Sequence, residues 1–491
     1  MTPAPQRGSA MTASTPAGPG PSRAGPGSWP ARALADAEPV CFWLDNPLAP
    51  EPSPPHEGRT ECELAVVGGG FTGLWTALLA KERDPSSEVV LLEAGRVGWQ
   101  ASGRNGGFCM STLTHGIDHG TRHFPVEVDT LERLGLENLD AIESFVADHA
   151  IECDWRRSGE MGVATEPYQV AEIGGWKRAL DEHGDDAEYF DREAIQAEIH
   201  SPRFLAAVWE KRACAMVDPA RLAWGVARVC REAGVRMHEN TKVLGLSRGE
   251  STISLSTLGG TVHARKVALA TNAFRSFARQ ARRRVVPVYD HALMTEPLTP
   301  ERWESVGWRR RQGISDVANQ FHYYRVTEDG RILWGGYDAL YYYGSAIDPC
   351  LEERQRTYEM LSRHFFEWFP QLEGVRFTHR WAGVVDVCTR LCPFFGTAMG
   401  GRVAYALGYT GMGVGEARFG ANVMLDLLSG EPTELTRLQL VRKQPMAWPS
   451  EPLRWAAIEL TRQSLDWADK HEGRRNLWLR TLDQFGLGYD S

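Results

Sequence analysis

Three glycines, Gly68, Gly70 and Gly73, have the spacing of a loop that can hold a pyrophosphate. In such a loop the first glycine allows a tight turn, the second lets the phosphates approach the backbone, and the third lets a helix pack against a strand. Phe71 and Thr72 would begin that helix, whose free backbone N–H groups and dipole favour negative charge. The loop therefore predicts a site for a dinucleotide.

The elements on either side of the loop support this prediction. The mostly apolar run 62–67 predicts a buried parallel strand, and Leu74, Ala77 and Leu78 at helical spacing predict a helix that ends near Pro85. The run 88–92 predicts a second strand, and Glu93 follows Gly73 by about 20 residues, where a carboxylate bonds the ribose hydroxyls. This unit fits either NAD or FAD.

A polar, glycine-rich segment follows, where an enzyme that uses only a nicotinamide would build another crossover helix. Its N–H groups could follow a long cofactor past the pyrophosphate, which favours FAD, whereas the alternative is an ordinary surface loop. The candidate cofactor contacts in this segment are Ala94, Arg96, Ala101, Ser102, Gly103, Arg104, Asn105 and Gly106.

The rest of the chain predicts an α/β fold, α+β overall. Residues 125–233 are mostly helical in pattern, and strands at 235–246, 251–255 and 261–270 would return to the first sheet. Aromatic and β-branched runs at 285–289, 321–324 and 332–336 predict a separate antiparallel sheet. A final strand at 403–407 leads through a glycine turn into a helix. We expect a Rossmann-like FAD-binding domain with a central, mostly parallel sheet and a substrate domain with a mixed or antiparallel sheet.

The expected domain organisation is discontinuous. Residues 1–40, rich in Pro, Gly, Ala and Ser, form a disordered tail, with a transit peptide as the alternative. The FAD-binding domain comprises 41–124, 205–280 and 380–435, and the substrate domain comprises 125–204 and 281–379. Residues 436–491 form a helical extension, in which 452–476 packs on the body or makes a dimer contact; the oligomeric state is left open.

Composition excludes several other classes of function. The net charge is −9, from 54 Lys and Arg against 63 Asp and Glu, so we expect no nucleic-acid partner. Nine scattered cysteines lack the spacing of a zinc site, so we expect no metal and a reducing cytoplasm. No apolar run approaches the roughly 18 residues of a membrane span, so we expect no membrane partner.

The sequence resembles the D-amino-acid oxidase superfamily of FAD-dependent oxidoreductases, within it most closely the gamma-glutamylputrescine oxidase-like amine oxidases. The motifs that carry the resemblance are 42–45, 66–74, 101–107, 323–325, 380–383 and 408–414. The resemblance implies that segment 101–107 passes beside the flavin and that the turn of Gly408, Tyr409, Gly411, Met412 and Gly413 meets the pyrimidine side of its ring. It also implies weaker contacts from Val243, at the adenine, and from Thr271.

The resemblance further implies chemistry at a C–N bond. A small amine or amino-acid substrate, with a gamma-glutamylputrescine-like compound as one candidate, would give a hydride to the flavin and leave an imine that water hydrolyses. Either His291 or Tyr289 would accept the amine proton or line the ring, and Arg325 would bind a substrate carboxylate. Tyr323, Tyr324, Tyr341, Tyr342 and Tyr343 would enclose the substrate chain. Packing in the sheet is the alternative for all of these side chains.

Departures from the family pattern leave the electron acceptor open. Met412 replaces a histidine of the nearest relatives, and the strand 331–336 lacks a lysine that sarcosine-oxidase-like relatives use with oxygen. Oxygen or another acceptor would reoxidise the flavin, and a flavin-binding protein without amine oxidation is a further alternative. Cys388 and Cys392 raise the question of covalent flavin, but noncovalent FAD is favoured. Asp386 would pair with a substrate amine or lie in a solvated turn.

Overall fold

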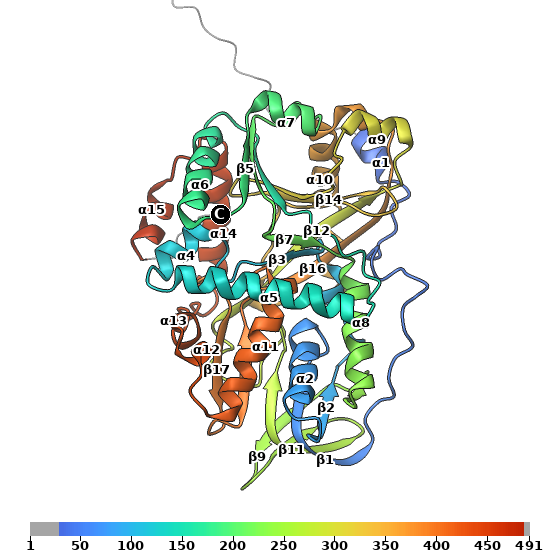
Figure 1. The fold of residues 1–491 in the computed structure, drawn as a ribbon, viewed down its shortest axis with the longest axis vertical. Helices are drawn as coiled ribbons and strands as arrows, with labels where there is room; N and C mark the ends of the chain where they lie inside the picture. Colours follow the sequence, from blue (N-terminus) through green and yellow to red (C-terminus); the bar gives the residue numbers. More distant parts are fainter. Residues whose placement is uncertain (1–28, 486–491) are drawn as a thin grey trace, which may run out of the picture.

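The computed structural model describes residues 29–485. Figure 1 shows two sheet-containing halves, with the first sheet and helices α2, α8 and α11 in the lower half and the second sheet above them. Of the expected disordered tail, residues 1–28 lie outside the described residues. Residues 29–40 are ordered, contrary to expectation, because the short helix α1 (Trp29–Ala33) packs Trp29 edge-on against Phe366.

The first sheet confirms the predicted parallel core. Its main path runs β17-β18-β11-β1-β2-β8, and β9 and β10 extend it as an antiparallel hairpin beside β11. All pairs from β18 to β8 are parallel, and only β17 runs antiparallel at the edge. The strands are β1 (Gly58–Val67), β2 (Val89–Leu92), β8 (Arg236–His238), β9 (Gly245–Arg248), β10 (Ile253–Ser256), β11 (Gly260–Leu269), β17 (Phe394–Ala398) and β18 (Val403–Leu407).

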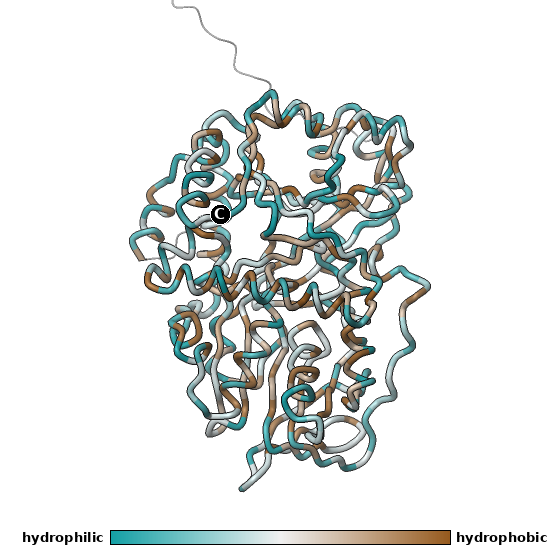
Figure 2. The backbone as a smooth tube through the Cα atoms, in the orientation of Figure 1, coloured by the Kyte–Doolittle hydropathy of each residue, from teal (hydrophilic) through white to brown (hydrophobic). Residues whose placement is uncertain are grey.

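Different layers cover the two faces of this sheet. Alternate side chains of β1 and β2 pack against helices α2 (Phe71–Arg83), α8 (Pro219–Glu232) and α11 (Gly413–Ser429), and α5 (Val128–Asp148) lies across α11. The other set of side chains packs against the β9–β10 hairpin and residues near Ala278. Figure 2 shows these inner strands as largely apolar. Pro219 occupies the first turn of α8, as predicted, where its missing N–H costs no hydrogen bond.

The second sheet has the order β16-β12-β15-β14-β13-β4-β6-β5 and is antiparallel except between β13 and β4. Helix α10 (Gln355–Trp368) packs on one face through a cluster of aromatic side chains. The strands are β4 (Glu160–Ala164), β5 (Ala187–Phe190), β6 (Ala206–Glu210), β12 (Val285–Thr295), β13 (Gly313–Asp316), β14 (His322–Val326), β15 (Ile332–Gly336) and β16 (Phe377–Cys388). A separate pair, β3 (Phe108–Met110) and β7 (Cys214–Met216), links the two halves.

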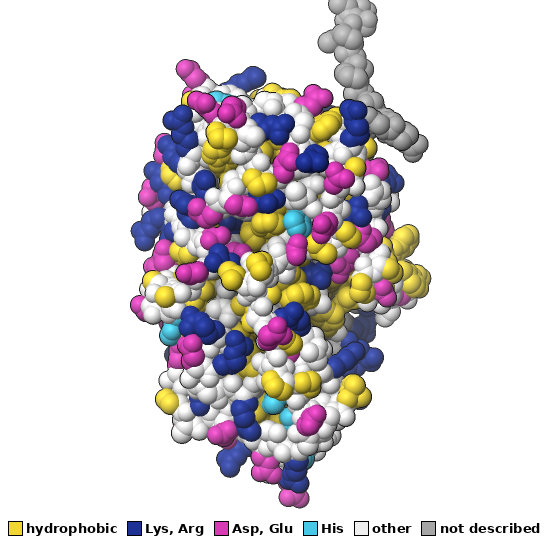
Figure 3. Space-filling model, turned by 90° about the vertical axis from the view of Figure 1, so that its right-hand side faces the viewer, with side chains coloured by type: hydrophobic (Ala, Val, Ile, Leu, Met, Phe, Trp, Pro, Cys, Tyr) yellow, Lys and Arg dark blue, Asp and Glu magenta, His cyan; other side chains and the backbone are white. Residues whose placement is uncertain are grey.

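The remaining elements are short or peripheral. They are α3 (Ala101–Arg104), α4 (Ile117–His123), α6 (Gln169–His183), α7 (Arg192–Glu198), α9 (Pro300–Val306), α12 (Glu434–Arg437), α13 (Gln439–Arg442), α14 (Leu453–Asp469) and α15 (Leu477–Gln484), with 3-10 turns at Tyr343–Ser345, Pro349–Leu351 and Pro370–Leu372. On the face drawn in Figure 3, basic and acidic side chains are interspersed. No helix of the described residues is long and apolar enough to cross a membrane.

Three sequence expectations need correction. Residues 125–233 are not mostly helical, because β4, β5, β6 and β7 lie among the helices. These strands have three to five residues each, and β4 is fixed by pairing with β13, about 150 residues later. The expected strand 235–246 shortens to β8, because the next backbone groups turn to bond Glu93 and Gly95 instead. The expected boundaries at 205 and 380 also assign β6 and β16 to the cofactor domain, whereas both strands pair within the second sheet.

The C-terminal extension packs back on the second sheet. The carboxylate of Asp469, at the end of α14, accepts hydrogen bonds from the backbone N–H of Asn319 at 3.0 Å and of Gln320 at 2.9 Å, and from the Asn319 side chain at 2.7 Å. Trp448 and Ile458 pack against Val286 and neighbouring side chains. The helix α14 is therefore joined to the body along its length.

Candidate active site

The glycine loop lies at the carboxyl edge of the first sheet, between β1 and α2. Gly68 has φ of +109°, and a Cβ there would overlap the carbonyl oxygen of Ala270 at the end of β11. A Cβ on Gly73 would overlap the carbonyl oxygen of Gly68. The cap residue of α2, Gly70, contributes no side-chain hydrogen bond. Strand and helix therefore meet at backbone distance, and the first turn of α2 has the form of an anion site.

Glu93 follows β2 at the same edge. Its carboxylate accepts hydrogen bonds from the N–H of Gly69 and of Gly95, both at 2.7 Å. Burial raises the pKa of this carboxyl. The N–H of Thr241 donates to the Glu93 carbonyl at 2.7 Å, which brings the segment leading to Val243 alongside Glu93 and Ala94. Glu93, the predicted ribose contact, and the segment of Val243, the predicted adenine contact, therefore lie side by side.

The segment 101–107 packs on the start of α2. Residues Ala101–Arg104 form the one-turn helix α3, and the Ser102 hydroxyl accepts a hydrogen bond from the Phe71 N–H at 2.9 Å. The Asn105 side chain accepts from the Gly107 N–H at 2.8 Å, which fixes the turn into β3. Gly103 leaves no room for a side chain beside the Gly98 carbonyl.

Arg96 is one sequence-predicted cofactor residue whose side chain is bonded to groups outside the glycine loop. Its guanidinium donates to the Pro50 carbonyl and stacks over the Trp99 ring at 4.4 Å. The hydroxyl oxygen of Thr271, by contrast, is buried beside the loop and has no hydrogen-bond partner among the described residues. A ligand hydroxyl or phosphate at this edge would satisfy it.

The second glycine turn lies next to the first. Gly408 and Gly411 have φ of +81° and +95°, and Met412 caps α11 without a side-chain hydrogen bond. The Thr72 hydroxyl donates to the Tyr409 hydroxyl at 3.0 Å, which joins the two turns across 337 positions of sequence. Two helix N-termini therefore begin side by side, and Gly413 follows as the first residue of α11.

Asp386 holds this second turn. Its carboxylate accepts from the Gly408 N–H at 2.5 Å, and its side chain is 2% exposed. Burial raises the pKa of Asp386 to about 7, against the lowering effect of the backbone hydrogen bonds. Asp386 is neither in a solvated turn nor open to a substrate amine, so both alternatives considered for it are wrong.

The structure separates Tyr289 and His291 from the glycine segments. Successive side chains of a strand point to opposite faces, so these two share a face of β12, where His291 contacts Tyr358 of α10 and Tyr289 packs with Leu340 and Tyr342. The Tyr289 hydroxyl accepts from the Asp348 N–H at 2.9 Å, and the buried His291 ring packs edge-on against Tyr358. Burial lowers the pKa of His291 to about 4. Neither side chain reaches the face that meets segment 101–107.

Asp290, between them, lies on that face, and sequence reasoning missed it. Its carboxylate accepts a hydrogen bond from the Tyr323 hydroxyl at 2.5 Å. The Tyr323 ring lies against Gly106, where a Cβ would come within 2.7 Å of the ring, and against Gly335. Burial raises the pKa of Asp290 to about 6. Strand alternation with one acid in the apolar run 285–295 was the signal that could have found it.

Arg325 is a structural arginine in this site. Its side chain is buried, and its Nη1 donates to the carbonyls of Val217 at 2.5 Å and Gly107 at 3.1 Å. The guanidinium also lies over the Trp43 ring at 5.5 Å. Burial lowers the pKa of Arg325 to about 10. These contacts fasten segment 101–107 to the end of β7 and leave the expected substrate carboxylate without this partner.

The other tyrosines predicted to enclose the substrate have separate partners, away from segment 101–107. The Tyr324 hydroxyl donates to Asp316 at 3.0 Å, Tyr341 bonds Glu451, and Tyr342 donates to the Leu351 carbonyl at 3.2 Å. Tyr343 is exposed. Of the five, the structure brings Tyr323 to segment 101–107.

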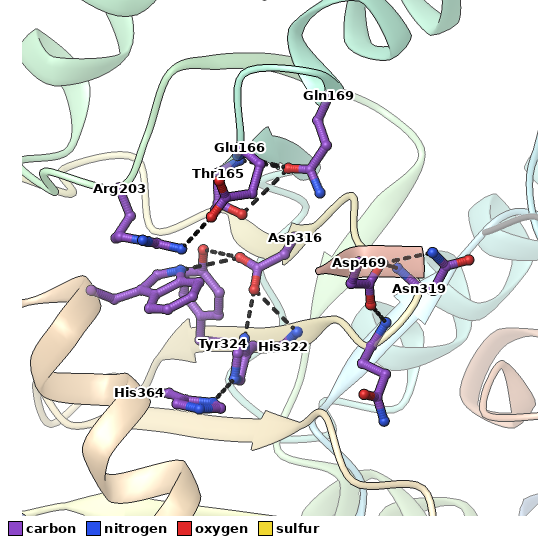
Figure 4. Close-up of polar contacts among 12 residues, drawn as sticks. Thr165, Glu166, Gln169, Arg203, Asp316, Asn319, His322, Tyr324, His364 and Asp469 are labelled. Atoms are coloured by element: carbon purple, nitrogen blue, oxygen red, sulfur yellow. Dashed lines mark hydrogen bonds and ion pairs between the residues drawn. The ribbon is translucent and has the colours of Figure 1, made fainter. Parts of the chain in front are cut away.

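A second polar cluster lies on the α10 side of the second sheet (Figure 4). Asp316 accepts from His322 Nδ1 at 2.6 Å and from the Tyr324 hydroxyl, and His322 Nε2 meets His364 Nδ1 at 3.0 Å. Burial and the neighbouring His322 hold the pKa of His364 well below its usual range. Among the described residues, no group of three or more His, Cys, Asp or Glu could hold a metal ion.

The buried cysteines near the second turn are ordinary thiols. Cys388 donates to the Cys392 carbonyl at 3.1 Å, and burial raises the pKa of both thiols. A thiol with a raised pKa is a poor nucleophile at neutral pH.

The residues present fit FAD. The parallel strands end together at Gly68, Glu93, Thr271 and Gly408, two uncapped helix N-termini face that edge, and the second sheet covers it. This combination defines a flavin-type dinucleotide-binding oxidoreductase. The chain belongs to the family of FAD dependent oxidoreductases (DAO), whose family description matches residues 63–427.

Individual relatives agree with this assignment. The chain is 31% identical to the gamma-glutamylputrescine oxidoreductase of Escherichia coli (strain K12) over 376 residues, which cover 75% of this chain and 84% of the relative. It is 26% identical to the sarcosine oxidase subunit beta of Arthrobacter sp over 69% of this chain and 79% of the relative. The glycine oxidase of Geobacillus kaustophilus has the same fold, with a TM-score of 0.66 at 18% identity over 78% of this chain and 99% of that one.

Proposed function

We propose that this FAD-dependent oxidoreductase oxidises a C–N bond of a small amine or amino acid, with a gamma-glutamylputrescine-like amine as the leading candidate. The observation that carries the proposal is the junction of the two glycine turns through Thr72 and Tyr409, next to segment 101–107, whose Gly106 lies against the Tyr323 ring. The 31% identity to a gamma-glutamylputrescine oxidoreductase supports the substrate class.

The flavin, when bound, supplies the acceptor for the hydride that leaves the carbon next to nitrogen. The protein would hold the cofactor in position and stabilise its negative charge. The first turn of α2 and Glu93 would hold the pyrophosphate and ribose, and the uncapped start of α11 favours negative charge at the Gly408–Gly413 turn. Asp386 keeps that turn in place through the Gly408 N–H.

Two further points belong to the proposal. We infer noncovalent FAD, because the buried thiols of Cys388 and Cys392 are held protonated. The strand β15 presents Leu333 and Gly335 on the face of Tyr323 and carries no lysine. Together with Met412, this favours a second candidate, a dehydrogenase whose electron acceptor is not oxygen.

One experiment tests both activities. Purified yellow holoenzyme is mixed anaerobically with a panel of amines and amino acids, and the flavin absorbance is followed before and after admission of air. Bleaching by an amine supports the proposal, and rapid recolouring in air identifies an oxidase. If no compound of the panel bleaches the flavin, the proposed function is wrong. Acid precipitation of the same protein should leave the flavin in the supernatant if it is noncovalent.

A further inference from the structure

Asp290 is a carboxylate whose charge has no local compensation. It lies on β12 opposite Gly383 of β16, on the face that meets segment 101–107. One oxygen accepts the hydrogen bond of Tyr323, whose ring spans the space between Gly106 and Gly335. Asp290 itself is half-buried, so a small ligand can reach it. In the part of the chain that the structure describes, Asp290 forms no ion pair.

The nearby cations are committed elsewhere. Arg104 of α3 pairs with Glu352 at 2.6 Å and donates to the carbonyls of Trp99 and Ala382. Arg325 of β14 is bound to the carbonyls of Gly107 and Val217. A partly desolvated carboxylate without a cation is unfavourable unless a partner arrives from outside. This face therefore offers a negative group to a ligand, while Arg104 is held by Glu352 and the Nη1 of Arg325 by two backbone carbonyls.

We propose that Asp290, positioned by Tyr323, binds the cationic nitrogen of the substrate and selects amines that lack a carboxylate beside the reacting carbon. This inference rests on the proposed function and narrows it, because the carboxylate of an α-amino acid would meet nearby cations, Arg104 and Arg325, that are already bonded to other groups. An ammonium N–H would donate to the Asp290 carboxylate, which would take up that proton so that the hydride leaves the adjacent carbon of a neutral amine. The expected ligands are alkylamines, diamines and their conjugates.

The test uses a matched pair, 1,4-diaminobutane and ornithine, which differ by one α-carboxylate. The holoenzyme is reduced with dithionite, so that a ligand binds without being oxidised, and binding is measured by calorimetry. We expect the wild-type protein to bind the diamine at least about tenfold more tightly than ornithine, because the α-carboxylate of ornithine would be desolvated beside Asp290 without a cation of its own. In Asp290→Asn, diamine affinity should fall about tenfold or more and the preference should vanish.

Controls separate recognition from folding. Asp329→Asn, in the exposed turn between β14 and β15, removes a carboxylate of the same sheet and should leave diamine binding unchanged. Flavin content and circular dichroism show whether Asp290→Asn is folded. If that variant does not fold, Tyr323→Phe carries the test, since it keeps the carboxylate but should weaken diamine binding several-fold through lost positioning.

The outcomes distinguish the two proposals. Equal diamine affinity in wild type and Asp290→Asn, or wild-type preference for ornithine, would overturn the role of Asp290. The proposed function would survive that result as long as some amine or amino acid bleaches the oxidised flavin. It fails separately if none does.

Discussion

At the residue scale, Gly73 decides whether the cofactor loop can form. A Cβ at this position would overlap the Gly68 carbonyl oxygen, and no flexible side chain is available to move away. We expect Gly73→Ala to be purified with less than about a tenth of the wild-type flavin, because displacing the loop by even 1 Å removes the phosphate contacts. The measurement is the ratio of flavin to protein absorbance.

Gly174→Ala is the matched control for Gly73→Ala. Gly174 lies inside α6, where the nearest atom to an added Cβ is the mobile end of Arg178 at 3.7 Å. This variant should retain full flavin and a slightly higher melting temperature, because alanine favours helix over glycine. Normal flavin content in Gly73→Ala would show that the loop is not the cofactor site.

The pH dependence of amine binding follows from Asp290. Burial raises the pKa of its carboxyl to about 6, so the carboxylate is ionised at pH 7.5 and mostly protonated at pH 5. The facing groups are Tyr323 of β14 and the Arg104–Glu352 pair, in which burial raises the pKa of Glu352. The affinity of reduced holoenzyme for 1,4-diaminobutane should therefore fall about tenfold from pH 7 to pH 5. Calorimetry should show no such slope in Asp290→Asn; a parallel slope would assign the titration to another group.

Single residues also show which parts of the candidate site could be predicted from the sequence and which could not. Gly68, Gly73 and Glu93 could be predicted because their roles depend on contacts within one strand-helix-strand unit. Tyr289 and His291 were predicted from residue type without the side of the strand, and Asp290 was not considered. Arg325 has the chemistry of a carboxylate ligand, but two backbone carbonyls from distant segments occupy it, and no local pattern reports them.

At the scale of elements, Asp316 ties β13 and β14 to α10. It accepts hydrogen bonds from His322, from Tyr324 and, at 3.3 Å, from Trp368 of α10. Asp316→Asn leaves at least one of these buried groups without its partner, so we expect a loss of about 2 to 4 kcal/mol in the free energy of unfolding. Urea denaturation measures this loss.

His364→Gln is the comparison for Asp316→Asn. His364 is half-buried and contributes one hydrogen bond, to His322, so its replacement should cost about 1 kcal/mol. Equal losses in the two variants would contradict the central position of Asp316 in the cluster.

The elements differ in how far local sequence determines them. The helix α2 and the strands β1 and β2 are long or apolar enough to be predicted, and α8 is marked by its first-turn proline. The strand β4 takes its conformation from β13 and β6, and the segment after β8 leaves the sheet to bond Glu93 and Gly95. Pairing partners about 150 residues away cannot be deduced from periodicity over five residues.

At the scale of the whole molecule, opposed carboxylates should make stability depend on pH. Glu210 lies directly across from Glu160 in the β4–β6 pair, with Glu132 and Asp185 nearby. Burial and these neighbours raise the pKa of Glu210 to about 8. Between about pH 4.5 and pH 8 the folded protein holds a proton there that the unfolded chain lacks, so this contribution to stability is present in acid, declines as pH rises above 4.5 and is lost by about pH 8.

Glu210→Gln should therefore weaken the decline in stability between pH 5 and pH 8. Urea denaturation at both pH values measures the slope for wild type and variant. Glu188→Gln, on β5 beside Lys211, is the control and should keep the wild-type slope. If Glu210→Gln follows the wild-type curve, the carboxylate is not protonated in the folded protein.

The hydrogen bond between Thr72 and Tyr409 has a consequence for biogenesis. In the central sheet, β1 lies between β11 and β2. The strand β18, which precedes the second glycine turn, begins only at residue 403, so it is synthesised long after β1. On the ribosome, the early glycine loop thus emerges long before the turn that completes the flavin site. We expect nascent chains that stop before β17 to bind no flavin, so that the cofactor is acquired after translation is nearly complete.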